Sequence, residues 1–327
     1  LRDTTPAVTE RRKPLSDAER VTHERLAAIA RDANDTELIH RRFIEPMREV
    51  DELRFVADAP AKIGSRRPDA NAVSLAIADL LAKARDEVLL QTPYLVLSRD
   101  SRRMFKAKRE SDPDLVVRVS TNSLAGTDAY PVYALSYKYK KRYLRELGFR
   151  IYEFKPYPGQ LTEIIETPTP DNPPRLSLHG KSAVIDGEIS LIGTHNFDPR
   201  SDKFNTEAAV IIYDRAFAQR LTATLRRDIA PANSWVIAPR ERGPVLFYNL
   251  SRLLENISTA LPIFDFWPFR YASSFEKRPS CPPLARDHPD FYACHRDVGD
   301  FPQVDSLWKR VLTRIATAFG APMAPIL

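Results

Sequence analysis

The sequence predicts an α/β sandwich with a mixed or largely parallel sheet. Strand-type and helix-type patterns alternate through the middle of the chain, and 43% of its 327 residues are hydrophobic, enough for a sizeable core. No apolar run reaches the length of a transmembrane helix, so we expect any membrane attachment to be peripheral or to reside in sequence beyond this chain. We divide the chain into a helical connecting segment at 1–50, a central domain at 51–238 and an extension at 239–327.

The elements of the central domain follow from their residue patterns. A strand is predicted at 53–57, a basic loop at 62–68, an amphipathic helix at 71–84 and a buried strand at 87–94. Further helices are predicted at 102–110, 133–147 and 215–227, further strands at 115–120 and 149–154, and a surface loop at 155–174. The basic residues of helix 133–147 are expected to form a solvated face or to meet lipid headgroups.

The two ends of the chain have their own character. Ser16 and Glu19 have the spacing of a capping box, which predicts a helix in the connecting segment. Segment 306–319 is predicted as a basic amphipathic helix that carries Trp308 and that lies either on an anionic membrane or on its own domain. The chain begins at Leu1 without a leader or an initiator methionine, and we interpret it as a processed product or an excised piece.

The extension is rich in proline and aromatic residues. Its segment 263–271, with Trp267, predicts either an insertion packed on the domain or a surface at a bilayer interface. Cys281 and Cys294 bracket a loop, and they are either a disulfide, which would imply an extracytoplasmic setting, or free thiols. A zinc site with the nearby histidines is conceivable, but the spacing matches no strong pattern.

One stretch, 178–207, carries a regular pattern of reactive residues. Its motif residues occur in the order His179, Lys181, Asp186, Gly193, Thr194, Asn196. Alternation predicts a strand at 176–184 with His179 and Lys181 on one face, then a hairpin turn at Asp186 and a returning strand at 189–192. The residues after the second strand should therefore return to His179.

Those residue types suit the chemistry of a phosphodiester. Lys181 supplies a fixed charge, and Thr194 and Asn196 supply hydrogen-bond donors for the non-bridging oxygens. An imidazole can attack phosphorus or hand a proton to a leaving alcohol, if a partner holds its tautomer. Glu207 is our candidate for that partner, and we expect Asp186 to hold the turn rather than touch substrate.

The pattern resembles the HKD motif of the phospholipase D superfamily. The stretches GTHNFDPRS and NTE, TPYLV at 92–96, TNSLAGTDAYPVY at 121–133 and the final SLWKRVLTRIA are similar to bacterial cardiolipin synthases, especially the C-type enzyme. The resemblance implies an α-β-α sandwich and a phosphatidyl transfer through a phosphohistidine, without metal or cofactor. It maps His179, Lys181, Asn196 and Glu207 onto catalytic positions, with Asp186 as the motif aspartate and Thr194 beside them.

Three other residues are candidates for substrate binding. Tyr94 and Asn122 end two predicted strands, where ligands bind in open α/β sheets, although core or turn roles are equally open. His195 stands where the family usually has an aromatic or small residue, and it is either a second titrating group at the rim or a packing residue. Gly180 stands where the family often has alanine.

The resemblance also implies a missing partner. Enzymes of this superfamily need two such motifs across one site, and of the six histidines here only His179 has a lysine two residues on. The second motif would come from a homodimer partner or from an N-terminal half upstream of Leu1.

We therefore expect a bacterial, membrane-associated phosphatidyltransferase that acts on phosphatidylglycerol and a phosphatidyl donor, on a side of the membrane left open. A hydrolase or nuclease at the same site, or an inactive membrane-binding half-site, remain alternatives. The net charge of +6 and the pI near 9.2 favour anionic partners without choosing among them.

Overall fold

The computed structural model describes residues 16–63, 68–165, 173–240 and 271–319, and the chain divides into two compact units, Leu1–Glu49 and Val50–Leu327. The described part of the first unit consists of α1 (Asp17–Asn34), α2 (Thr36–Ile39) and a π-helical turn at His40–Ile44. Helix α1 begins directly after Ser16, where the capping pattern predicted a helix. None of the described helices is both long and apolar enough to span a bilayer.

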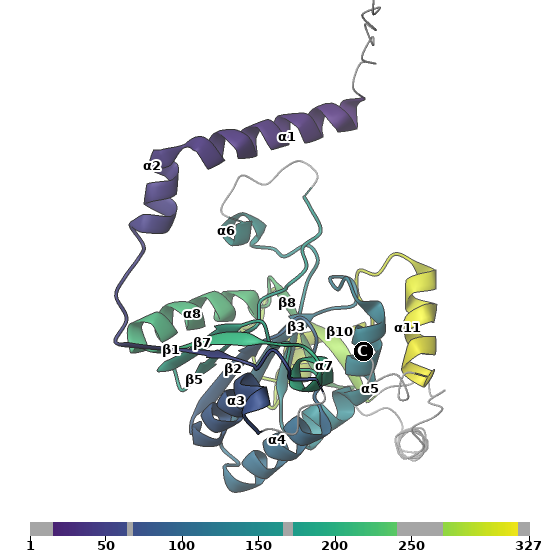
Figure 1. Ribbon diagram of the computed structural model, residues 1–327. Helices are drawn as coiled ribbons and strands as arrows, with labels where there is room; N and C mark the ends of the chain where they lie inside the picture. The colour runs from purple at the N-terminus through teal and green to yellow at the C-terminus, as the bar shows by residue number, and fades with distance from the viewer. Residues whose placement is uncertain (1–15, 64–67, 166–172, 241–270, 320–327) are drawn as a thin grey trace, which may run out of the picture. The chain divides into compact units, whose positions relative to one another are not determined.

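The second unit is built on one sheet, which in the described part of the chain has the strand order β1-β7-β6-β5-β2-β3-β4-β8-β9-β10 (Figure 1). The strands are β1 (Glu52–Ala57), β2 (Glu87–Gln91), β3 (Val116–Asn122), β4 (Arg150–Phe154), β5 (Ser182–Ile185), β6 (Ile189–Gly193), β7 (Ala208–Tyr213), β8 (Ser234–Pro239), β9 (Ala272–Lys277) and β10 (His295–Gly299). The β2–β3 and β3–β4 pairs are parallel and the other pairs are antiparallel. The predicted α/β fold with a mixed sheet is confirmed.

Helices cover both faces of the sheet. Helices α3 (Ala72–Lys83), α4 (Arg99–Ser111) and α5 (Tyr130–Arg145) pack on one face, and α8 (Arg215–Asp228) packs on the other. The neighbouring residues Leu89 and Leu90 of β2 illustrate this, because each is buried in a different core. Since successive strand residues point to opposite faces, a strand buried on both sides has the continuous apolar run seen in the sequence.

Short helices complete the unit. They are a 3-10 turn at Pro68–Asn71, α6 (Leu161–Ile165), α7 (Pro199–Lys203), α10 (Phe291–Cys294) and the longer α11 (Leu307–Phe319). The predicted boundary at residue 238 falls within β8, and β9 and β10 continue the same sheet. The predicted extension thus contributes two strands to the central domain, and its aromatic segment 263–270 lies outside the described residues.

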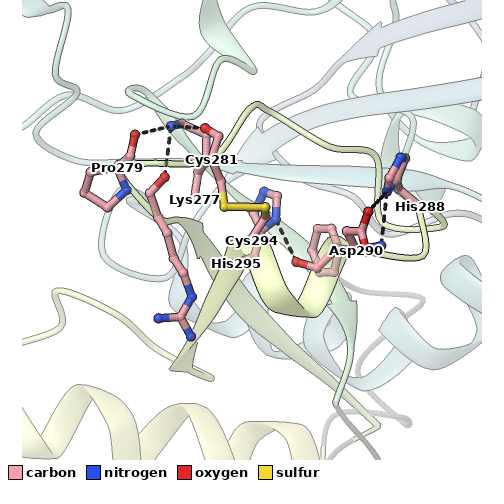
Figure 2. The surroundings of a disulfide bond; sticks show 9 residues. Lys277, Pro279, Cys281, His288, Asp290, Cys294 and His295 are labelled. Carbon is pink, nitrogen blue, oxygen red and sulfur yellow. Dashed lines mark hydrogen bonds and ion pairs between the residues drawn. A yellow bond between two sulfur atoms is a disulfide. The ribbon is translucent and has the colours of Figure 1, made fainter.

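The two cysteines form a disulfide, one of the alternatives that the sequence left open (Figure 2). The nearby histidines have other partners. His295 donates a hydrogen bond from Nδ1 to the carbonyl of Phe291 at 3.0 Å and stacks on its ring, and burial lowers the pKa of His295. His288 accepts a hydrogen bond from the backbone N–H of Asp290, so neither histidine supports the zinc alternative.

Two lysines of the second unit are buried, and one of them, Lys140, was expected on a solvated helix face. The Lys140 ammonium lies 2.6 Å from the Glu153 carboxylate, because position 140 falls on the face of α5 that packs against the sheet. Burial raises the pKa of Glu153, and the Lys140 charge opposes that rise. The other is Lys62, which lies in the predicted basic loop. Its buried ion pair with Asp58 belongs to the site described next.

Candidate active site

The hairpin at the centre of the motif forms as predicted. Strands β5 and β6 pair in antiparallel register, and Asp186 and Gly187 make the turn with φ of 53° and 66°. The Asp186 carboxylate accepts hydrogen bonds of 2.8–2.9 Å from three successive backbone N–H groups at the start of β2. Asp186 therefore ties the hairpin to the sheet at the end of β5 away from Lys181, so it acts on the fold and not on substrate.

The chain that carries His179 is extended but lies outside the sheet, so the strand predicted from 176 begins only at Ser182. The reason is the carboxamide of Asn122. Its Oδ1 accepts from the backbone N–H of Leu178 at 2.8 Å, and its Nδ2 donates to the carbonyl of Leu178 at 2.7 Å. Asn122 is buried, with its carboxamide occupied by this backbone, and it positions His179 rather than lining a pocket as we had expected.

Lys181 folds back onto His179. Its ammonium lies 2.8 Å from Nδ1 and 3.2 Å from Nε2 of the ring and donates to the His179 carbonyl at 2.9 Å. Desolvation lowers the pKa of Lys181, and the carboxylates of Glu207, Asp128 and Asp198 oppose the change. The amine and the imidazole of the predicted motif are therefore in contact, at an exposed position.

Tyr94 forms one wall beside this pair. Its ring meets the His179 ring edge-on, with centroids 6.4 Å apart, and its hydroxyl donates to Asp128 at 2.9 Å. Burial and this hydrogen bond raise the pKa of Tyr94 to about 12, so its hydroxyl stays protonated at neutral pH. The structure thus brings Tyr94 to the site, together with Asp128, which sequence reasoning missed.

Thr194 reaches the site because Gly193 allows a close approach of two strands. A β-carbon at Gly193 would lie 2.5 Å from the backbone oxygen of Ala208. The Gly193 N–H donates to the carbonyl of Lys181 at 3.0 Å, which sets Thr194 next to the lysine. The Thr194 hydroxyl donates to the Glu207 carboxylate.

Glu207 is not the partner of His179 in this arrangement. Within the described residues its carboxylate is hydrogen-bonded to Thr194, and no hydrogen bond joins it to the imidazole. Glu207 directly precedes β7, which lies beside β6, so the hydroxyl at the end of β6 is the group within its reach. The role of Glu207 as the partner that fixes the tautomer of His179 therefore stays a prediction.

Asn196 is held by its backbone, which leaves its side chain unused. Its carbonyl accepts from the Thr92 hydroxyl at 2.6 Å, and its N–H donates to Ser201 at 3.0 Å. In the part of the chain that the structure describes, no hydrogen bond engages its carboxamide, whose Oδ1 is buried. A buried amide oxygen without a partner is uncommon in folded proteins, which marks this carboxamide as a candidate for contact with a ligand.

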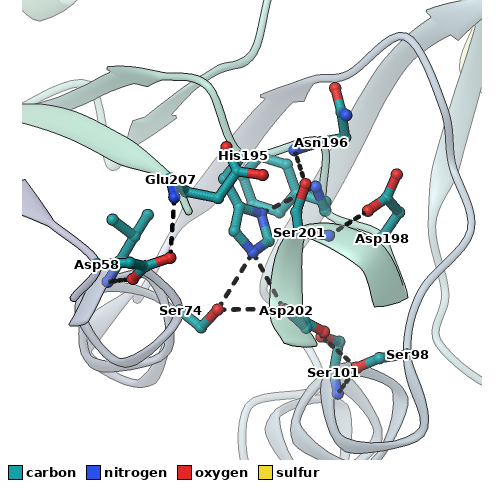
Figure 3. Close-up of polar contacts among 12 residues, drawn as sticks. Asp58, Ser74, Ser98, Ser101, His195, Asn196, Asp198, Ser201, Asp202 and Glu207 are labelled. Carbon is teal, nitrogen blue, oxygen red and sulfur yellow. Dashed lines mark hydrogen bonds and ion pairs between the residues drawn. The ribbon is translucent and has the colours of Figure 1, made fainter. Parts of the chain in front are cut away.

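Of the two roles that the sequence left open for His195, the structure favours the packing role over a titrating group at the rim. It is buried, and its Nδ1 accepts from the N–H of Phe197 at 2.9 Å. Its Nε2 lies 3.0 Å from Asp202 and 3.2 Å from Ser74, as Figure 3 shows. Burial acts to raise the pKa of Asp202, but hydrogen bonds from His195 and Ser98 leave it below its usual value. His195 thus fastens α7 and the motif loop to α3.

A buried ion pair underneath the site was not found from the sequence. Lys62 and Asp58 lie 2.7 Å apart, and both side chains are 0% exposed. The Asp58 carboxylate also accepts from the N–H of Glu207 at 3.1 Å (Figure 3). Lys62 donates to the carbonyl of Ser201. The pair therefore supports the two segments that carry Glu207 and Asn196.

The sequence of this region matches a known protein family. Residues 77–229 match the family model described as the phospholipase D-like domain of cardiolipin synthase, and this range contains all nine candidate site residues. Residues 77–229 form a domain of the phospholipase D superfamily. Within this phospholipase D domain, the structure groups His179, Lys181 and Tyr94, with Thr194 next to the lysine.

The relatives are longer than this chain. It is 31% identical over 212 residues to an uncharacterized protein of Helicobacter pylori strain J99, a match that covers 62% of this chain and 40% of that protein. It is 27% identical over 214 residues to cardiolipin synthase C of Escherichia coli K12, covering 65% and 44% respectively. Among solved structures, the phospholipase D family member Nuc from Salmonella typhimurium aligns with a TM-score of 0.39 and 12% identity, over 56% of this chain and 95% of that one.

Proposed function

We propose that this chain forms one half of the active site of a phosphatidyltransferase of the cardiolipin synthase type. The observation that carries the proposal is the contact between the Lys181 ammonium and the His179 ring, 2.8 Å from Nδ1, in the domain that matches the cardiolipin synthase family model. An amine beside an imidazole, with a free carboxamide from Asn196 nearby in the motif, provides charge and donors for the anionic oxygens of a phosphodiester.

The reaction would have two steps. In the first, an imidazole nitrogen attacks the phosphorus of the donor phospholipid, the bond to the leaving alcohol breaks, and that oxygen takes a proton from a second imidazole. In the second, the free hydroxyl of phosphatidylglycerol attacks the phosphohistidine, gives its proton to the second imidazole, and breaks the P–N bond. We assign the acid and base role to His179 and the phosphorylated histidine to a facing half.

The facing half is proposed to lie in sequence upstream of this chain. His179 is the one histidine of the six with a lysine two residues on, and the match covers only 44% of cardiolipin synthase C. A second copy of the chain is the other source of a facing motif. We further propose an oxidising compartment for this domain, because disulfides persist there. Thiol labelling of the protein taken directly from cells, before and after reduction, tests this placement.

The decisive experiment is product analysis with the complete enzyme and vesicles that contain phosphatidylglycerol. His179→Ala should lower the rate of cardiolipin formation by at least about 10³-fold, since the acid and base of both steps is lost. His23→Ala, at an exposed position of α1, is the matched control. A near-normal rate for His179→Ala would remove this residue from the mechanism, and phosphatidic acid as the main product would assign hydrolysis instead of transfer.

A further inference from the structure

Helix α11 packs on the domain through its polar face. Thr313 and Thr317 are fully buried, and the Thr317 hydroxyl is hydrogen-bonded to the carbonyl of Ala134 in α5 at 3.3 Å. The two threonines are four residues apart and so lie on one side of the helix. The contact with α5 therefore uses the threonine side of an otherwise amphipathic helix (Figure 1).

The apolar side of α11 is exposed. Its members are Leu307, Trp308, Val311, Leu312 and Ile315, which we call the apolar stripe. Leu307 and Trp308 are 74% and 73% exposed, values that a residue in a docked helix face would not have. The sequence left two roles open for this helix. The threonine side packs on the helix's own domain, so the apolar stripe is free to contact another apolar partner.

A basic cavity of about 490 Å³ opens beside the stripe. Among the described residues, its wall contains three arginines, Arg240, Arg310 and Arg314, and one acidic residue, Asp300. The Asp300 carboxylate lies 2.6 Å from Arg240 and 3.2 Å from Arg314, so it orients both guanidiniums. Arg310 donates a hydrogen bond from Nε to the carbonyl of Val304 at 2.8 Å. This bond fixes the Arg310 side chain and does not use its two terminal amino groups.

One further acid lies near this wall. Asp297 contributes to raising the pKa of Arg240, although burial of Arg240 acts in the opposite direction. The Asp297 carboxylate already accepts hydrogen bonds from Ser273 and from the N–H of Gly299. Among the described residues the wall is therefore rich in arginine, and Arg310 and Arg314 each come one residue before a member of the apolar stripe.

The cavity is connected to the active site by one layer of packing. Phe301 of its wall packs against Tyr133 and Tyr137 of α5 and, in the same cluster, Leu124 and Ala125. The last two follow Asn122, the residue that holds the His179 segment. The carbonyl of Ala125 also accepts from Arg175 at 3.0 Å, four residues before His179.

We propose that this cavity binds the phosphate of an intact anionic phospholipid while the apolar stripe enters the interface of the bilayer. Guanidinium groups bind phosphate through paired hydrogen bonds, and a tryptophan beside basic residues suits the headgroup region. The choice of an anionic phospholipid as the ligand rests on the proposed function. It assigns a site that anchors the domain at its substrate surface and takes no part in the reaction.

The test measures binding of the 327-residue chain to vesicles of phosphatidylcholine with and without phosphatidylglycerol. The pair Arg310→Ala and Arg314→Ala should weaken binding to the phosphatidylglycerol vesicles by about 30-fold, since each basic residue at an anionic surface contributes roughly a factor of five. The charge-matched pair Arg103→Ala and Lys106→Ala, on exposed positions of α4, should change it less than about twofold. Unfolding midpoints establish that the variants are folded.

Trp308 reports on the stripe itself. In a Trp267→Phe background its emission should shift to the blue when anionic vesicles are added, and Trp308→Phe should remove that shift, since the remaining Trp235 is buried already. Titration with inorganic phosphate and glycerol phosphate separates the two sources of the anion, and neither should displace the bound vesicles at millimolar concentration.

Three outcomes would overturn the proposal. They are equal vesicle affinity of the arginine pair and the wild type, displacement of vesicles by soluble phosphate, and a dimer that Trp308→Ala abolishes in a chain that binds no vesicles. His179→Ala should bind vesicles as the wild type does. Vesicle binding without any transfer activity would leave the cavity assignment in place while refuting the proposed function, so the two failures are distinguishable.

Discussion

Replacing Asn122 is expected to separate a positioning role from a substrate-binding role. The carboxamide makes two hydrogen bonds with the backbone of the buried Leu178, at 2.8 Å and 2.7 Å. Asn122→Ala leaves a buried N–H and a buried carbonyl without partners, at about 1–3 kcal/mol each. We therefore expect the free energy of unfolding to fall by about 2–6 kcal/mol, with no ligand present.

Urea unfolding of the isolated chain is a suitable assay. With a slope of about 3 kcal/mol per molar urea, the expected loss lowers the midpoint by at least about 0.7 M. A residue that only lined a pocket would contribute little to stability, so an unchanged midpoint in Asn122→Ala would refute the positioning role. Activity of the complete enzyme should also fall, because His179 follows Leu178 directly.

Asn122→Asp adds a test through pH. The introduced carboxylate still accepts from the Leu178 N–H but has no proton for the Leu178 carbonyl, so its folded-state pKa is raised above the ordinary value of about 3.9. The folded state then binds more protons than the unfolded state between the two pKa values. The penalty relative to wild type is therefore full above the raised pKa and shrinks as the pH falls toward about 4. A penalty independent of pH would contradict the geometry.

Three further predictions follow from other contacts. Gly193→Ala should lower the free energy of unfolding by about 1–3 kcal/mol, because its β-carbon would lie 2.5 Å from a backbone oxygen, whereas Gly126→Ala, with nearest atoms at 3.4 Å, should be nearly neutral; equal urea midpoints would disprove the close approach. Reduction of the Cys281–Cys294 disulfide should lower the free energy of unfolding by about 3 kcal/mol in thermal unfolding. The stability of the double serine variant should not change with reductant, and a wild type that is equally insensitive would mean that the disulfide is absent. In ultraviolet titration Tyr94→Phe should remove a phenol that ionises near pH 12, as burial and its carboxylate partner require, and loss of one that ionises near pH 10 would show Tyr94 to be exposed.

Local features of this protein could be predicted from the sequence. The turn at Asp186 and the returning strand β6 were expected at the right residues, because turn chemistry and alternation act within a dozen positions. Helices α5 and α8 were expected within three residues at each end, since helical periodicity is also local. The meeting of Lys181 with His179 belongs to the same class, because the two residues are only two positions apart.

The roles of the buried polar residues could not be predicted in this way. Asn122 was assigned to a pocket wall although its partner is the Leu178 backbone, 56 positions away, and Lys62 was placed in a loop although it donates to a carbonyl 139 positions away. A carboxamide or an ammonium has the same donors wherever it stands, so its role depends on which group the fold sets opposite to it. The sequence by itself determined which chemical groups this protein brings and where its local elements run. Only the tertiary structure decided which of those groups are hydrogen-bonded to the backbone and which remain for a ligand. The reason is that hydrogen-bond partners far apart in the chain meet only after the sheet has formed.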